Sequence, residues 1–131
     1  MIIYIDTANC QTNIALLDDD CNIIANIIWG VARNQSEELL SKIHEMLKNN
    51  HLAINQITGI IVVSGPGSYT GLRVGIASAN ALAFSLKIPI WDAPLDAIKD
   101  RELLKRLIKQ DPEKIIQANY LRPPHISISK K

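Results

Sequence analysis

The sequence has almost no excess charge of either sign. Its 14 lysine and arginine residues stand against 13 aspartate and glutamate residues, for a formal net charge of +1. A protein that binds nucleic acid by itself usually carries a strongly basic surface, because it has to neutralise phosphates. The balance of charges therefore argues against a stand-alone nucleic-acid-binding protein. If RNA takes part in the function, we expect a partner to supply most of the phosphate contacts.

The sequence also lacks long apolar runs and export signals. No apolar run approaches the ~20 residues that a membrane-spanning helix needs, and the run at 2–5 has no basic region before it and no cleavage site after it. Cys10 and Cys21 have no CxxC spacing, so we expect reduced thiols, with a single disulfide as the alternative. Together these absences predict a cytoplasmic protein with no membrane contact.

Residue patterns that would indicate a metal site or catalysis are missing as well. The histidines His44, His51 and His125 are scattered, with no spacing typical of a metal site. The three successive aspartates at 18–20 lack the alternation and the glutamate of an EF-hand loop, and we predict a solvated turn there. We therefore predict no metal, no cofactor and no catalytic residue.

What the sequence does contain is a regular series of strand and helix patterns. Its 131 residues fit one domain. The alternating or wholly apolar segments predict strands, and the segments with a 3.6-residue period predict helices. The expected elements are strands 2–5, 12–17 and 22–29, helix 35–48, strand 57–63, helix 71–86, strand 88–91 and a C-terminal helix 95–109.

This order predicts an α/β fold with a single ribonuclease-H-like domain. Its mixed sheet has the order β-β-β-α-β-α-β, because three strands joined by tight turns precede a central, wholly apolar strand. Pro112 ends the last helix. We expect the domain to cover 1–114 and a C-terminal tail, with a Tyr-Leu-Arg element, to cover 115–131.

A glycine-rich segment joins strand 57–63 to helix 71–86. A strand, a glycine loop and a helix N-terminus can hold a phosphate, but the spacing matches neither a Walker A loop nor a dinucleotide fingerprint. A tight turn that brings the helix close to the sheet is the alternative, with Ser68 and Thr70 as helix caps. The possible vestigial phosphate loop consists of Asp6, Thr7, Gly65, Gly67, Ser68, Thr70, Gly71 and Arg73.

Helix 71–86 is apolar nearly all round, with no charged residue from Val74 to Leu86. A helix at the surface of a small domain normally has a polar face. One face should therefore pack on the sheet, while the other needs a cover. We predict that a ridge of small residues, which allows close helix–helix approach, faces a partner together with the apolar side of helix 35–48. The predicted interface is Leu39, Leu40, Ile43, Met46, Leu47, Leu72, Gly75, Ile76, Ala79, Leu82 and Ala83. The alternative is that the third helix or the tail of the same chain supplies the cover.

Three separated motifs together resemble the TsaB (YeaZ) family. They are Asp6-Thr7, the run Gly-Pro-Gly-Ser-Tyr-Thr-Gly-Leu-Arg-Val-Gly at 65–75, and Tyr120-Leu121-Arg122. The resemblance implies a non-catalytic scaffold subunit that binds the catalytic paralogue TsaD and supports threonylcarbamoyl transfer to adenosine 37 of tRNA. It also implies membership of the actin/hexokinase-like superfamily, a TsaE-type ATPase in the assembled complex, a homodimer when the chain is alone, and only indirect contact with tRNA.

The chain departs from the family pattern in two places. Family members carry a second lobe between the matching blocks, and here only 93–114 fill that place. A histidine commonly precedes the serine of the first helix, and here it is Gln35. Two other functions stay open. One is a homodimeric adaptor, and the other is a weak nucleotide hydrolase that uses Asp6, the counterpart of a phosphate-side carboxylate in actin-like ATPases, and the 65–71 loop.

Overall fold

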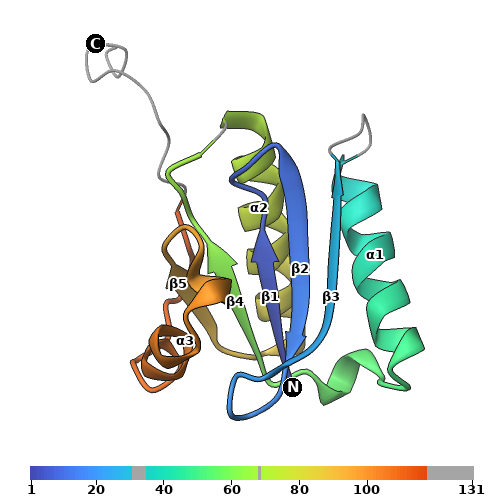
Figure 1. Ribbon diagram of the computed structural model, residues 1–131, viewed down its shortest axis with the longest axis vertical. Helices are drawn as coiled ribbons and strands as arrows, with labels where there is room; N and C mark the ends of the chain where they lie inside the picture. The colour runs from blue at the N-terminus through green and yellow to red at the C-terminus, as the bar shows by residue number, and fades with distance from the viewer. Residues whose placement is uncertain (31–34, 68, 118–131) are drawn as a thin grey trace.

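The structure is a computed structural model that describes residues 1–30, 35–67 and 69–117, without the side chains of Tyr69 and Thr70. Within these residues the chain forms a five-stranded sheet of order β3-β2-β1-β4-β5 (Figure 1). The helices and strands are β1 (Ile2–Asp6), β2 (Gln11–Leu17), β3 (Ile23–Gly30), α1 (Gln35–Asn49), η1 (Ile54–Gln56), β4 (Gly59–Val63), α2 (Tyr69–Leu86), β5 (Ile90–Ala93), η2 (Ala97–Lys99) and α3 (Arg101–Leu107).

The sheet is mixed, as the sequence predicts. β1 pairs antiparallel with β2, and β2 pairs antiparallel with β3, whereas β1, β4 and β5 are parallel. Every residue of β1 and β4 is buried, because both strands lie in the middle of the sheet and are covered on both faces. The predicted order β-β-β-α-β-α-β and the single α/β domain are confirmed.

Helices cover the two faces of the sheet unequally. α1 and α2 lie on one face, and α3 lies on the other, near β4 and β5 (Figure 1).

The 18–20 turn joins β2 to β3, and its Asp18 carboxylate accepts the backbone N–H groups of Asp20 and Asn22 at 2.9 Å and 2.8 Å. These hydrogen bonds lower the pKa of Asp18. The predicted solvated turn is confirmed.

The third predicted helix, 95–109, is too long. The structure has a short 3₁₀ turn, η2, followed by α3, and Asp100 separates them with a non-helical backbone (φ −126°, ψ 89°). The Asp100 carboxylate accepts the Leu103 N–H at 3.1 Å, as the N-cap of α3. Because an aspartate side chain competes for backbone donors, it starts a new helix here rather than continuing one.

The end of α2 also differs from the prediction. Lys87 adopts a left-handed conformation (φ 57°), and the Ile88 N–H donates to the Ala83 carbonyl at 3.1 Å. This arrangement ends the helix, so the next strand begins at Ile90 rather than at residue 88.

Within the described residues, no helix is long and apolar enough to cross a membrane. Both cysteines are free, Cys10 exposed and Cys21 buried.

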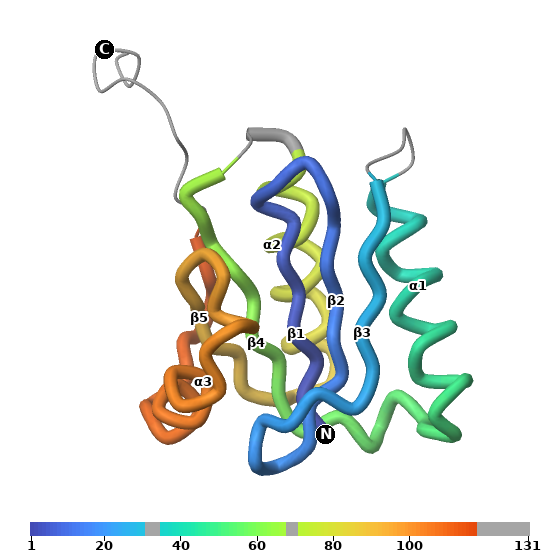
Figure 2. Tube along the Cα trace, viewed as in Figure 1, coloured from blue at the N-terminus to red at the C-terminus, as the bar shows by residue number. Residues whose placement is uncertain are grey.

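The segment after α3 stays attached to the body of the domain (Figure 2). The Glu113 N–H donates to the Ile90 carbonyl at 2.9 Å, and Ile116 is 4% exposed. Residue 116 of the predicted tail is therefore part of the packed structure. Residues 118–131, including the Tyr-Leu-Arg element at 120–122, lie outside the described residues.

Candidate functional site

The carboxyl end of β1 places Asp6 and Thr7 beside the start of α2. Asp6 is 4% exposed, and its carboxylate accepts the Ala8 N–H at 2.9 Å. Burial raises the pKa of Asp6, and the nearby charge of Asp96 raises it further. The Asp6 carboxyl is therefore buried and hydrogen-bonded within its own turn.

Two glycines allow the turn after β1 to pack closely against the glycine loop and against α2. A Cβ on Gly67 would lie 2.5 Å from the Ala8 carbonyl oxygen, and a Cβ on Gly75 would lie 2.1 Å from the Thr7 Oγ1. Gly65 has φ 119°, which favours glycine. This close packing supports the tight-turn interpretation of the predicted phosphate loop.

The other members of that predicted set lie in different places. Gly71 is buried in the first turn of α2, and Arg73, two residues further on, is exposed. Ser68 and the side chain of Thr70 lie outside the described residues, so their capping role stays a prediction. Among residues 1–30, 35–67 and 69–117, no three histidine, cysteine, aspartate or glutamate side chains gather where they could hold a metal.

The sequence analysis did not single out one polar contact at this end of the sheet. The Ser64 hydroxyl donates a short hydrogen bond to the Asp92 carboxylate and ties the end of β4 to β5. Ser64 is 6% exposed. Asp92 lies on β5 and Ser64 directly follows β4, but their pairing has no sequence signal, because the two lie 28 positions apart.

The predicted interface on α2 is wrong about which face points outward. Ala79 is fully buried. The prediction places Leu72, Ile76 and Ala83 on the same face, and they are at most 6% exposed. Gly75 packs on Thr7. The small residues bring α2 close to its own sheet, and they are not available to a partner helix.

The predicted interface on α1 is mostly core as well. Leu39, Ile43, Met46 and Leu47 are at most 4% exposed, because α1 packs this side on the sheet and on α2. Leu40 is 46% exposed. Of the whole predicted set, only Leu40 and the half-buried Leu82 remain accessible.

An apolar surface nevertheless exists on the opposite side of the same two helices. We call it the outer face and define it by Leu40 of α1 and by Ala77, Ala81, Leu82 and Phe84 of α2. Phe84 is 86% exposed, and both alanines are exposed. The predicted interface did not include Ala77, Ala81 or Phe84.

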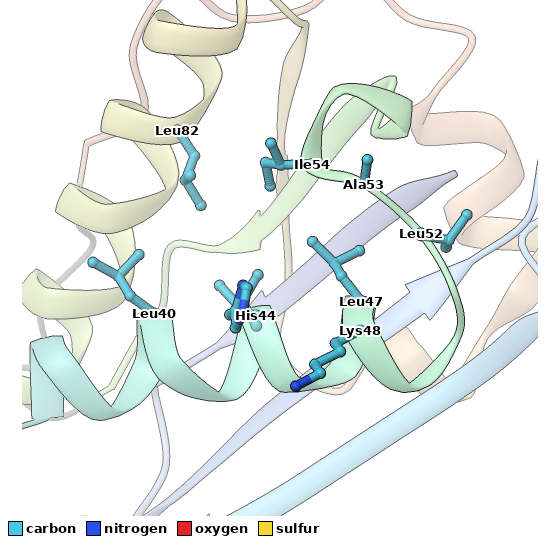
Figure 3. Close-up of a pocket in the computed structure, with 9 residues that line it drawn as sticks. Leu40, His44, Leu47, Lys48, Leu52, Ala53, Ile54 and Leu82 are labelled. Carbon is cyan, nitrogen blue, oxygen red and sulfur yellow. The ribbon is translucent and has the colours of Figure 1, made fainter.

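Two grooves border the outer face. One lies between α1 and α2 and is lined by Ser36, Leu40, Ala77, Ser78, Ala81, Leu82 and Ser85. The other, of about 370 Å³, lies where α1, α2 and η1 meet, and Leu40, Leu82 and Ile54 enclose it with Lys48 at its edge (Figure 3). α3 lies on the far side of the sheet and therefore does not cover this surface. The sequence analysis offered the third helix or the tail as a cover from the same chain, and the third helix is now excluded.

Comparison with known proteins shows similarity to proteins whose names refer to tRNA modification. Residues 23–92 match the family model described as TsaD, tRNA N6-adenosine threonylcarbamoyltransferase. The tRNA threonylcarbamoyladenosine biosynthesis protein TsaB of Bacillus subtilis is 42% identical over 89 residues, which cover 68% of this chain and 38% of that protein. The protein of the same name from Buchnera aphidicola is 36% identical over 88 residues, covering 67% of this chain and 39% of that protein.

A solved structure has the same fold. YeaZ from Pseudomonas aeruginosa superimposes with a TM-score of 0.65 at 22% identity, over 77% of this chain and 49% of that one. The chain thus spans less than half the length of these relatives.

Proposed function

Because this chain belongs to the TsaB (YeaZ) family, we propose that it is a non-catalytic subunit of the machinery that makes tRNA threonylcarbamoyladenosine. In this proposal it pairs with the catalytic paralogue TsaD and activates it for threonylcarbamoyl transfer to adenosine 37. A TsaE-type ATPase joins the assembled complex. The net charge of +1 supports indirect rather than direct contact with tRNA.

The exposed apolar side of α2 carries this proposal. Phe84 leaves 86% of its surface in water beside the exposed Ala77 and Ala81. A contiguous apolar patch of this kind usually marks an interaction site. Small residues flanking one large aromatic suit helix–helix packing, because the alanines allow close approach and the phenylalanine fills a pocket of the partner.

The pairing surface of this proposal is the outer face, not the ridge around Ala79. Leu40 and Leu82 connect the two grooves along it. A helical hairpin of the partner would cover both grooves, and it would bury Leu40 and Phe84 at the centre of the contact.

A transfer assay tests the proposed function. Purified TsaD and TsaE of the same organism, with precursor substrates and tRNA, are assayed with and without this chain. We expect modification of adenosine 37 to require the chain, and we expect Phe84→Glu to abolish the stimulation. Ile28→Glu is the matched control, because Ile28 is also an exposed apolar residue (54%) but lies on β3. Transfer that is equally fast without the chain contradicts the proposal.

A further inference from the structure

Lysine side chains gather at one end of the outer face. α1 and α2 run in the same direction over their face of the sheet (Figure 1), so both helices end at the same end of this surface. Lys48 stands in the last turn of α1, and Lys87 directly follows α2. Lys114 lines the same groove as Lys87. All three lysines are exposed.

Each of these lysines borders an apolar groove that includes a residue of the outer face. Lys48 lines the groove where α1, α2 and η1 meet, and it follows Leu40 by two helical turns on one side of α1 (Figure 3). Lys87 and Lys114 line the groove at the end of α2, together with Phe84. The apolar centre of the outer face therefore continues into a basic rim at this end.

In the part of the chain that the structure describes, none of the three lysines has a carboxylate partner. The ion pair found there joins Lys99 to Asp96 on the other face of the sheet. The chain as a whole is nearly neutral, with a formal net charge of +1. The unpaired lysines are thus a local feature of this surface and not the result of a basic sequence.

Helix ends give a partial explanation of these lysines. A cation near the C-terminal end of a helix offsets the negative end of the helix dipole, and this role suits Lys48 and Lys87. It does not explain Lys114, which belongs to no helix and still lies at the same rim. Protein interfaces commonly combine an apolar centre with a polar rim whose charges complement those of the partner.

We infer that the partner surface that covers the outer face carries carboxylates at the end that meets Lys48, Lys87 and Lys114. The inference rests on the proposed function, in which this partner is TsaD. It defines the chemistry of the TsaD surface as an apolar helical face with aspartate or glutamate side chains at one end. Charges at the rim of an interface act mainly on association, so the lysines steer TsaD onto the outer face in one orientation.

Association kinetics with TsaD test the inference. Lys48→Glu, Lys87→Glu and Lys114→Glu are combined in one protein, the rim variant, and its association rate is measured by stopped flow at low and at high salt. At low salt we expect association about tenfold slower than that of the wild type, because attraction becomes repulsion. At high salt the difference should nearly vanish, because salt screens exposed charges.

The matched control combines Lys99→Glu, Arg106→Glu and Lys109→Glu. These residues are also exposed, and their replacement changes the net charge equally, but they belong to the side of the sheet that carries η2 and α3. We expect the control to associate at close to the wild-type rate. Equal rates for the two triple variants overturn the inference, and so does a loss in the rim variant that persists unchanged at high salt.

The same data separate this inference from the proposed function. If the wild type does not associate with TsaD at all, the proposed function fails and the inference fails with it. If the wild type and the rim variant associate equally fast, only the inference fails. Urea midpoints of all proteins check the fold, and the single variant Lys114→Glu, which changes no helix, repeats the test if the rim variant is unstable.

A second copy of this chain is the other candidate occupant of the rim. Sedimentation velocity of the chain alone, as wild type and as rim variant, measures self-association. A homodimer that the rim variant loses, while its kinetics with TsaD stay those of the wild type, would assign the lysines to self-pairing and overturn the inference.

Discussion

At the scale of single residues, the contact between Gly75 and Thr7 fixes how closely α2 approaches β1. Thr7 is fully buried, and its Oγ1, Cγ2 and Cβ atoms would lie 2.1, 2.7 and 2.9 Å from a Cβ on Gly75. A branched, buried side chain cannot move aside as the end of a flexible chain would. We therefore predict that Gly75→Ala lowers the free energy of unfolding by about 1–3 kcal/mol, measured by urea denaturation.

The matched control for this substitution is Gly30→Ala, because a Cβ on Gly30 would have no neighbour within 4 Å. We expect its urea midpoint to stay close to that of the wild type. Adding Thr7→Ala to Gly75→Ala should recover part of the loss, since it removes two of the three clashing atoms. If Gly30→Ala costs as much as Gly75→Ala, backbone freedom rather than the Thr7 contact explains the glycine.

Asp6 gives a prediction about pH. Burial raises the pKa of Asp6 above its ordinary value of 3.8, so the folded state binds this proton more tightly than the unfolded state does. Its contribution to stability is therefore fully present at pH values below 3.8 and is lost as the pH rises through the raised pKa. We predict that Asp6→Asn is more stable than the wild type at pH 7 and that the difference vanishes at acidic pH.

Urea midpoints of both proteins from pH 3.5 to 7 measure this difference. Asparagine can still accept the Ala8 N–H through its Oδ1, so the local hydrogen bond is kept. A variant that is less stable than the wild type at pH 7, with the difference vanishing at acidic pH, would show that the carboxylate stabilises the turn in its charged form.

At the scale of elements, the two faces of α2 should respond oppositely to the same substitution. Ala79 is fully buried against the sheet, whereas Ala77 is exposed. We predict that Ala79→Glu lowers the free energy of unfolding by about 3–5 kcal/mol, because it buries an unpaired charge. Ala77→Glu should leave the urea midpoint near that of the wild type and weaken pairing with TsaD. Loss of pairing by a folded Ala79→Glu protein would contradict the assignment of faces.

The Asn80 side chain on α2 holds the C-terminal segment at Ile116. Asn80→Ala removes both hydrogen bonds to Ile116, each worth about 0.5–1.5 kcal/mol. We predict faster hydrogen exchange at the Ile116 amide, measured by NMR. Asn50→Ala is the control, because Asn50 bonds only locally, to the Met46 carbonyl at 2.7 Å. An unchanged exchange rate at Ile116 would mean that the segment does not depend on Asn80.

The sequence predicts these elements better than it predicts their faces. The periodicity of apolar residues and the turn residues between them located all five strands and the first two helices. The prediction of the third helix failed at Asp100, where one side chain caps a new helix within a continuous apolar pattern. On α2, both faces are apolar, so periodicity gives the helix but not its orientation. Only the close contact of Gly75 with Thr7, which depends on three-dimensional packing, decides which side meets the sheet.

At the scale of the whole molecule, one sheet carries two unequal layers of helices. α3 and η2 cover one face, with Tyr4 buried beneath them, and burial raises the pKa of the Tyr4 hydroxyl. α1 and α2 cover the other face and turn an apolar surface outward. The chain spans 38% of the Bacillus subtilis relative, yet its described residues hold both helices of the outer face, so we expect this part alone to pair.

The most direct test of the account is light scattering on a size-exclusion column, with this chain alone and then mixed with TsaD of the same organism. We predict a stable mixed dimer that forms with the wild type and with Ile28→Glu but not with Phe84→Glu or Ala77→Glu. A chain that elutes apart from TsaD, or that pairs equally well with a charge at Phe84 and at Ala77, would contradict pairing through the outer face. Self-association that persists in the presence of TsaD would instead favour the homodimeric adaptor.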